Sequence, residues 1–310
     1  MTNKWFVIVN PVSGCGKGKK DWQKISNLLN DAGIEFKYAF TKYRGHAIKI
    51  ARKAIEEGWR GIICVGGDGT INEVVNGVFT QNYIPTTEVT LAMIPTGEGK
   101  DWGRTIGIPS DYEGAINAIR KGVTFVQDAG LVKYYDGDTQ RERYFVNVAG
   151  TGYDAFVTEK ANYMKEHGRS GALPYLLSLF TCLIKYKYTM VKLRVDGFES
   201  GGEVFSLNVG ICKYNGGGMM QVPGAIPDDG LFDLTVVKKL GKLEVIKNVR
   251  GLYDGSFINH PMVRIYRGKT ISIESAPKVY LELDGESLGH SPFQFGIIPR
   301  SVKVVVKIRA

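Results

Sequence analysis

The sequence predicts an α/β domain with a parallel sheet at residues 1–127, followed by a mostly antiparallel β domain at residues 128–310. Three observations support this prediction. The chain has 310 residues, more than a single hydrophobic core usually serves. Its first part alternates apolar runs with amphipathic segments, the order of strands and helices in a parallel sheet. After about Asp128, short β-like runs separated by turn residues take over.

The first part contains four apolar runs that we expect to be strands. They lie at residues 5–9, 36–40, 61–65 and 89–94. Other segments place apolar residues three or four positions apart, as amphipathic helices do. The expected helices cover residues 22–29, 46–57, 111–121 and a stretch that begins near residue 71.

The second part contains six further β-like runs and one apolar segment of helical length. The runs lie at residues 143–150, 191–198, 204–212, 231–237, 270–275 and 278–287. The expected helix covers residues 173–184, and it is too short to span a membrane. A last strand is expected at residues 301–308, and its return to the first domain is left open.

Charge and cysteine content narrow the class of protein. The formal net charge of +9 suggests an anionic partner, although a basic surface is also an ordinary feature of soluble proteins. The four cysteines form no CxxC motif and are typical of a reducing compartment. The first apolar run reads as a strand and not as a signal peptide. We therefore expect a cytoplasmic protein that associates with membranes only peripherally.

The segment ICVGGDGTINEVV, at residues 63–75, ends a buried strand in a glycine loop. Gly66, Gly67 and Gly69 let phosphate oxygens approach the backbone at the start of a helix that we expect from Thr70. Asp68 would repel a phosphate unless a Mg²⁺ lies between them, so we assign it to the metal. A turn aspartate is the alternative.

Thr70 and Glu73 have the T-x-x-E spacing of a capping box, which would give Glu73 a structural role. Two further glycine loops follow the first and fourth expected strands, VNPVSGCGKGKK and IPTGEGKDWGR. Neither matches a Walker A or a GxGxxG motif. Three such loops at one sheet edge predict a nucleotide-binding crevice.

Several motifs together resemble one enzyme family. NPVSG (10–14), GGDGTINE (66–73) and IPTGEGKDWGRTIGIP (94–109) occur in the order found in soluble lipid kinases of the diacylglycerol, sphingosine and ceramide kinase type. FVNVAGTGYDA, NGGGMMQVPGAIPDDGLFDLTVV and LELDGESLG resemble motifs of that family's second domain. The resemblance implies a fold like that of NAD kinases and phosphofructokinases, with the active site between two domains.

The resemblance also implies roles for individual residues, with ATP and Mg²⁺ as cofactors. Asp68 would lie near the catalytic Mg²⁺, and a structural Mg²⁺ would bind the carbonyls of Ile226 and Leu231 and the carboxylate of Asp229. From the residues alone, Asp228–Gly230 is equally typical of a plain turn. The residues implied to hold ATP are Asn10, Pro11, Ser13, Gly14, Thr41, Gly66, Gly67, Gly69, Thr70, Asn72, Glu73 and Gly97.

The DGE motif at residues 284–286 ends a predicted strand. Repulsion between the crowded Asp284 and Glu286 carboxylates would raise the pKa of one of them. That group would then be suited to accept a proton from an alcohol. The resemblance makes Glu286 this base, with Asp284 assisting. Without the resemblance, a hairpin tip is the more typical interpretation of the motif.

Two positions depart from the family pattern. Glu98 and Lys100 stand where a threonine and an asparagine are usual, and a glutamate would repel phosphate unless Lys100 or Mg²⁺ neutralises it. Glu98 is also compatible with a non-catalytic nucleotide or lipid sensor, which is one alternative. The other is an NAD kinase, which would share GGDGT and a β-rich second domain. A nucleic-acid partner is not expected, because the basic residues are not interleaved with aromatics on an RNA-reading motif.

The expected partners are a lipid substrate and, transiently, a membrane surface. The segment at residues 171–191 joins an apolar helix to Lys185, Tyr186, Lys187 and Tyr188. It is typical either of a core helix with a solvated end or of a wall beside the bilayer. The sequence names neither the lipid nor the oligomeric state, so a homodimer stays open.

Overall fold

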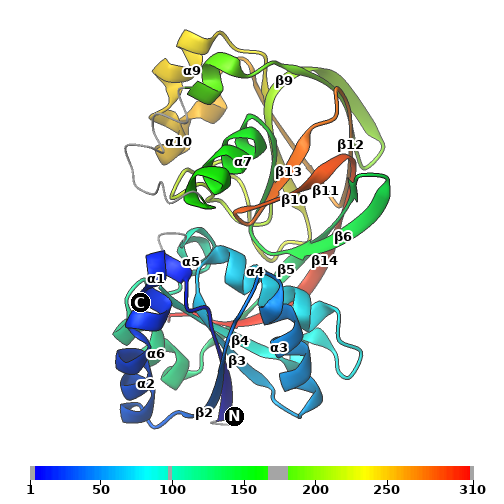
Figure 1. The fold of residues 1–310 in the computed structure, drawn as a ribbon. Coiled ribbons are helices and arrows are strands. Elements are labelled where there is room, and N and C mark those ends of the chain that lie inside the picture. The colour runs from blue at the N-terminus through cyan, green and yellow to red at the C-terminus, as the bar shows by residue number, and fades with distance from the viewer. Residues whose placement is uncertain (1–3, 97–99, 167–180, 308–310) are drawn as a thin grey trace.

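The structure is a computed structural model that describes residues 4–96, 100–166 and 181–307. It comprises two lobes, an α/β domain and a β-rich domain (Figure 1). The first-domain sheet has the order β2–β1–β3–β4, and all its strands are parallel. Their bounds are Lys4–Val9 for β1, Glu35–Phe40 for β2, Gly61–Gly66 for β3 and Thr90–Pro95 for β4.

Helices cover both faces of this sheet. Ile62 and Cys64 of β3 pack in the core that includes α3 and α4, whereas Ile63 and Val65 pack in the core that includes α2 and α6. A strand buried on both faces reads as a continuous apolar run, which explains IICV. The helices are α1 Ser13–Lys20, α2 Trp22–Asp31, α3 His46–Glu56, α4 Asp68–Phe79, the short 3-10 helix η1 Thr86–Glu88, α5 Asp101–Ile106 and α6 Tyr112–Lys121.

The second domain is an antiparallel β structure around its own core. Its strands are β5 Thr124–Asp136, β6 Thr139–Phe145, β7 Val148–Gly152, β8 Thr189–Val195, β9 Phe198–Gly210, β10 Phe232–Lys238, β11 Val263–Gly268, β12 Thr270–Ala276, β13 Tyr280–Leu283 and β14 Glu286–Val305. The expectation of a single helix was wrong. The helices include α7 Tyr153–Glu166, α9 Lys242–Asn248, α10 Gly251–Asp254 and the 3-10 helix η2 Ser256–Asn259. Of the helix expected at 173–184, only residues 181–184 are described, and they are helical.

The long strand β14 connects the two domains. Its first half pairs with β13 and β12, and near its end Lys303 and Val304 pair in parallel with Thr90 and Leu91 of β4. The last strand therefore returns to the first-domain sheet. Among the described residues, no helix is both long and apolar enough to cross a bilayer.

Candidate functional site between the two domains

The predicted phosphate loops meet at one edge of the first-domain sheet. Asn10, Thr41, Gly67 and Thr96 each follow the end of a parallel strand, so their loops leave the same edge. The Asn10 amide N–H donates to the Val65 carbonyl at 2.9 Å, which continues the ladder between the strands. This is the edge at which open α/β sheets bind ligands.

Short polar side chains hold these loops together. The Asn10 Nδ2 donates to Thr70 Oγ1 at 2.9 Å, and the Ser13 and Thr96 hydroxyls are 2.6 Å apart. Gly14 has φ +60°, and a Cβ on Gly18 would lie 1.9 Å from the Asn10 carbonyl oxygen. The first loop therefore folds back tightly on Asn10, beside the start of α4. Pro11 is part of this turn and its carbonyl accepts from the Lys19 N–H.

The helix behind GGDGT begins at Asp68, with Gly67 as its N-cap, and none of the described side chains caps it. The predicted capping box of Thr70 and Glu73 is therefore wrong. The Glu73 carboxylate accepts instead from the Gly45 and Ala47 N–H groups, at 2.6 and 3.0 Å, and so caps α3. The first amides of α4 lack a side-chain cap, which suits them to an anion.

Two carboxylates lie close together beside the glycine turn, Asp68 and Asp101. Asp68 accepts long hydrogen bonds from the Asp101 and Trp102 N–H groups, at 3.2 and 3.4 Å. Burial and the Asp101 charge raise the pKa of Asp68 to about 7. Asp101 is buried, and burial raises its pKa. Its Oδ2 accepts from the Gly217 N–H at 2.7 Å, whereas its Oδ1 has no hydrogen-bond partner among the residues that the structure describes.

These two carboxylates fit a divalent cation, because a positive charge would offset their burial and repulsion and would give the Asp101 oxygen a partner. Asp101 was not among the residues predicted from the sequence. Its signal was present, since it closes the third glycine loop, GEGKD, directly after a strand. Gly97 and Glu98 lie outside the described residues, and the Lys100 amine donates to the Ser110 carbonyl at 2.9 Å.

Asn72 joins the two domains and is not open to a nucleotide. Its side chain is fully buried, and its Nδ2 donates to Asp284 Oδ2 at 2.8 Å. Its Oδ1 accepts from Arg143 Nε at 2.9 Å, and Arg143 Nη2 reaches Glu286 Oε2 at 3.2 Å. One amide on α4 therefore fixes both carboxylates of the DGE motif, Asp284 directly and Glu286 through Arg143.

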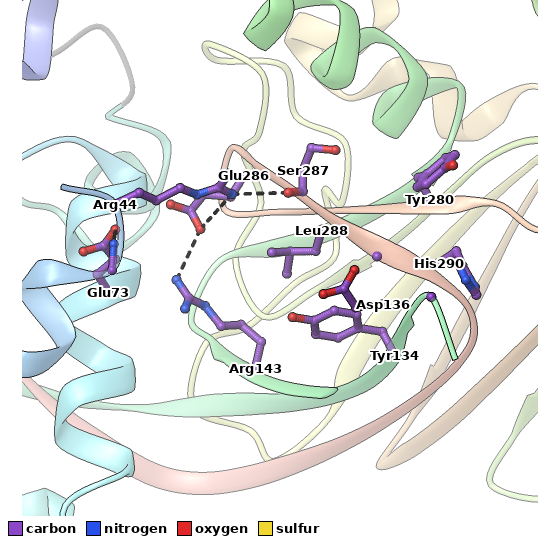
Figure 2. A pocket seen from close by; sticks show the side chains of 13 residues that line it. Arg44, Glu73, Tyr134, Asp136, Arg143, Tyr280, Glu286, Ser287, Leu288 and His290 are labelled. Carbon is purple, nitrogen blue, oxygen red and sulfur yellow. Dashed lines mark hydrogen bonds and ion pairs between the residues drawn. The ribbon is translucent and has the colours of Figure 1, made fainter. Parts of the chain in front are cut away.

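Figure 2 shows Glu286 between Arg44 and Arg143 at the wall of a cavity of about 640 Å³. Arg44 lies 3.5 Å from Glu286 Oε2 and donates to the Ser287 carbonyl. The other oxygen, Oε1, faces the glycine turn, since a Cβ on Gly69 would lie 3.6 Å from it. Neither arginine was predicted from the sequence, because nothing in their local pattern marks them.

The predicted crowding of Asp284 against Glu286 is wrong, although the hairpin interpretation is correct. Asp284 and Gly285 form the two-residue turn between β13 and β14, with φ +48° and +87°. The Asp284 carboxylate is buried and also accepts from the Val146 and Val148 N–H groups. Burial, and not Glu286, raises the pKa of Asp284 to about 6.

At the expected structural metal site, the Asp229 carboxylate already binds other groups of the protein. Asp229 Oδ1 accepts from the Leu231 N–H at 3.0 Å, and its Oδ2 pairs with the Arg267 guanidinium. Arg267 Nε also binds Asp233 at 3.1 Å. In the part of the chain that the structure describes, no three His, Cys, Asp or Glu side chains form a metal cluster. The Arg267 guanidinium therefore meets the Asp229 charge here, and cation binding by Ile226, Asp229 and Leu231 stays a prediction.

Glu282 is a buried carboxyl behind the DGE turn, and it predicts a pH dependence of stability. It accepts from the Gly285 N–H at 2.6 Å and from Asn215 Nδ2 at 2.8 Å, and burial raises its pKa to about 8. In this pH range Glu282 keeps its proton in the folded protein and loses it in the unfolded chain. The free energy of unfolding should therefore fall as pH rises from about 5 to 8.

Glu282→Gln should reduce the loss of unfolding free energy between pH 6 and pH 8, because the amide does not ionise. Urea unfolding at pH 6 and pH 8 measures it, with the exposed Glu274→Gln as the control. An unchanged pH slope in Glu282→Gln would contradict the assignment.

Comparison with known proteins places the chain in a family. The model of the diacylglycerol kinase catalytic domain matches residues 4–132, and that of the YegS C-terminal NAD kinase beta sandwich-like domain matches residues 147–306. A diacylglycerol kinase of Staphylococcus aureus (strain bovine RF122 / ET3-1) is 31% identical over 304 residues, covering 98% of this chain and 92% of the relative. The chain belongs to the diacylglycerol kinase family.

Two further diacylglycerol kinases also match nearly the whole chain. A diacylglycerol kinase of Staphylococcus haemolyticus (strain JCSC1435) is 31% identical over 299 residues, covering 96% of this chain and 86% of that protein. A crystal structure of a diacylglycerol kinase from Bacillus anthracis str. Sterne superposes with a TM-score of 0.72 at 25% identity, covering 99% of this chain and 97% of that one. The likeness therefore includes both domains.

Proposed function

We propose that the chain is an ATP- and Mg²⁺-dependent lipid kinase that phosphorylates a hydroxyl group of a lipid such as diacylglycerol or a sphingoid base. Membership of the family supports kinase activity, and one observation supports an alcohol as the phosphoryl acceptor. The Glu286 carboxylate, carried by the second domain, faces the Gly69 turn of the first domain across the interdomain site. A base beside a phosphate loop is the arrangement that phosphoryl transfer to an alcohol needs.

In this reaction, different residues bind the phosphates, accept the proton and hold the cation. The loops at the strand ends would hold the triphosphate, and the first amides of α4 would meet its charge. Arg44 and Arg143 hold Glu286 Oε2, which leaves Oε1 to accept the proton of the lipid hydroxyl. The hydroxyl oxygen bonds to the γ-phosphorus while the bond to the bridging oxygen of ADP breaks. Mg²⁺ bound at Asp68 and Asp101 would supply charge neutralisation for the phosphates.

Positioning should contribute most of the rate, because the transition state of phosphoryl transfer is loose. The cavity beside Glu286 is lined by Tyr134, Leu288 and His290 among others, and we assign it to the acceptor alcohol. Its walls come from the β5–β6 and β13–β14 hairpins and, on the side of the first domain, from Arg44, Gly45 and Glu73.

The first experiment is transfer of radiolabelled γ-phosphate from Mg-ATP to a panel of acceptors in mixed micelles. The panel contains diacylglycerol, a sphingoid base, ceramide and phosphatidylglycerol, with NAD in solution as the test of an NAD kinase. Transfer to one lipid supports the proposal and names the substrate class. Transfer to NAD alone, or no transfer by a folded protein that binds lipid without Mg-ATP, would contradict it.

A further inference from the structure

The segment NGGG, at residues 215–218 of the second domain, forms a tight loop with an unusual backbone. Gly216, Gly217 and Gly218 have φ of +65°, +85° and +99°, a left-handed conformation that glycine adopts without strain. The Asn215 and Met219 backbones exchange two hydrogen bonds, of 2.9 and 3.1 Å, which close the loop. We call residues 215–218 the NGGG loop.

The NGGG loop reaches the first domain at the candidate cation site. The Gly217 N–H donates to Asp101 Oδ2 at 2.7 Å, and just before the loop the Lys213 N–H donates to Thr105 Oγ1 at 3.1 Å. The loop is therefore fixed to α5, and it occupies one oxygen of Asp101. The other, Oδ1, lacks a hydrogen-bond partner among the described residues. Groups that bind a metal-ligating carboxylate from outside orient it and tune its affinity.

At its other end the NGGG loop binds the hairpin that carries Glu286. Asn215 Nδ2 donates to Glu282 Oε2 at 2.8 Å, while Asn215 Oδ1 accepts from the Gly216 N–H at 2.8 Å. Glu282 Oε1 accepts from the Gly285 N–H at 2.6 Å, and Gly285 directly precedes Glu286. The Asn215 and Glu282 side chains are buried, so bulk water does not compete for these hydrogen bonds.

These contacts form a continuous run of hydrogen bonds from the cation site to the base. The run begins at Asp101, passes through the NGGG loop and Glu282, and ends at the turn before Glu286. It is separate from the contacts of Asn72, which begin at α4 and do not include Asp101. A loop held at both ends limits how far either end moves alone.

We propose that the NGGG loop is a positioning element for both the cation and the base. Gly217 occupies Oδ2 of Asp101 and leaves Oδ1 free for the cation, while Asn215 carries the position of the loop to the DGE turn (residues 284–286). Bound Mg²⁺ therefore steadies the turn that carries Glu286. The role of Glu286 rests on the lipid kinase function, but the link between Mg²⁺ and the turn is measured without ATP, lipid or turnover.

The first test compares two glycines with similar backbone conformation. Gly217 and Gly197 have φ of +85° and +90°, and no described atom lies within 4 Å of a Cβ built on either. Alanine should strain both turns alike, but only Gly217→Ala displaces an N–H that binds Asp101. By calorimetry with magnesium chloride alone at pH 8, Gly217→Ala should raise the Kd of Mg²⁺ by about tenfold or more. Gly197→Ala should bind Mg²⁺ like the wild type.

The second test follows the DGE turn by hydrogen exchange. Mg²⁺ should slow amide exchange in both the NGGG loop and the DGE turn of the wild type, and Asn215→Ala should lose the response of the turn. With a lipid acceptor, kcat of Asn215→Ala should also fall by about 10²-fold, because the base is misplaced. The control is Gln81→Ala, which removes another buried amide that holds a loop, through Tyr83 and Ile84, and should respond like the wild type.

Two results would overturn the positioning role. One is equal Mg²⁺ affinity in Gly217→Ala and Gly197→Ala, and the other is a DGE turn that Mg²⁺ protects in Asn215→Ala as in the wild type. A wild-type protein that does not bind Mg²⁺, or whose DGE turn ignores it, would also overturn the proposal. The expected Mg²⁺ effects in a protein that phosphorylates no lipid would support the positioning role and contradict the lipid kinase function alone.

Discussion

Glu286→Gln is expected to lower kcat for lipid phosphorylation by about 10²–10⁴-fold, the usual contribution of a general base. The amide keeps the shape of the side chain and an oxygen that accepts from Arg143, but it does not take up the proton of the alcohol. KM for ATP should change little, because Glu286 belongs to the second domain and faces the acceptor cavity. Steady-state kinetics with the lipid found in the acceptor panel measures both parameters.

The control for this change is Glu199→Gln, an exposed glutamate at the β8–β9 hairpin. Thermal unfolding of each variant separates a lost base from a lost fold. A well-folded Glu286→Gln protein with undiminished kcat would contradict the assignment of Glu286 as the base.

Asp68→Asn is expected to lower kcat/KM for Mg-ATP by about 10²-fold or more, because a cation that neutralises transferring phosphates contributes several kcal/mol. The same change should stabilise the protein when no Mg²⁺ is present. Burial raises the pKa of Asp68 to about 7, so ionisation of this carboxyl above pH 7 costs folding free energy that a neutral amide avoids.

Thermal unfolding with and without Mg²⁺ distinguishes these effects. Added Mg²⁺ should raise the melting temperature of the wild type at pH 8 and leave that of Asp68→Asn nearly unchanged. Asp31→Asn, on the exposed side of α2, should respond to Mg²⁺ like the wild type. An equal Mg²⁺ response in Asp68→Asn would place the cation elsewhere.

The sequence alone determined the features that depend on neighbouring residues. Strands of the first domain were predicted within one or two residues, because runs such as IICV leave a buried parallel strand little alternative. The glycines of GGDGT predicted a phosphate loop from backbone geometry. The DG dipeptide at 284–285 predicted a hairpin tip, which β13 and β14 confirm.

Only the tertiary structure decided which side chains face the site and which hold it together. Asn72 and Glu73 lie in the phosphate-loop motif, yet their side chains bind Asp284 and the start of α3. Arg143 and Asp101 gain their roles from residues far away in the chain, Glu286 and Asp68. Such contacts are set by how the two domains and β14 bring distant segments together. The spacing of neighbouring residues does not predict such long-range contacts, whereas it does predict the period of a strand or the turn of a glycine loop.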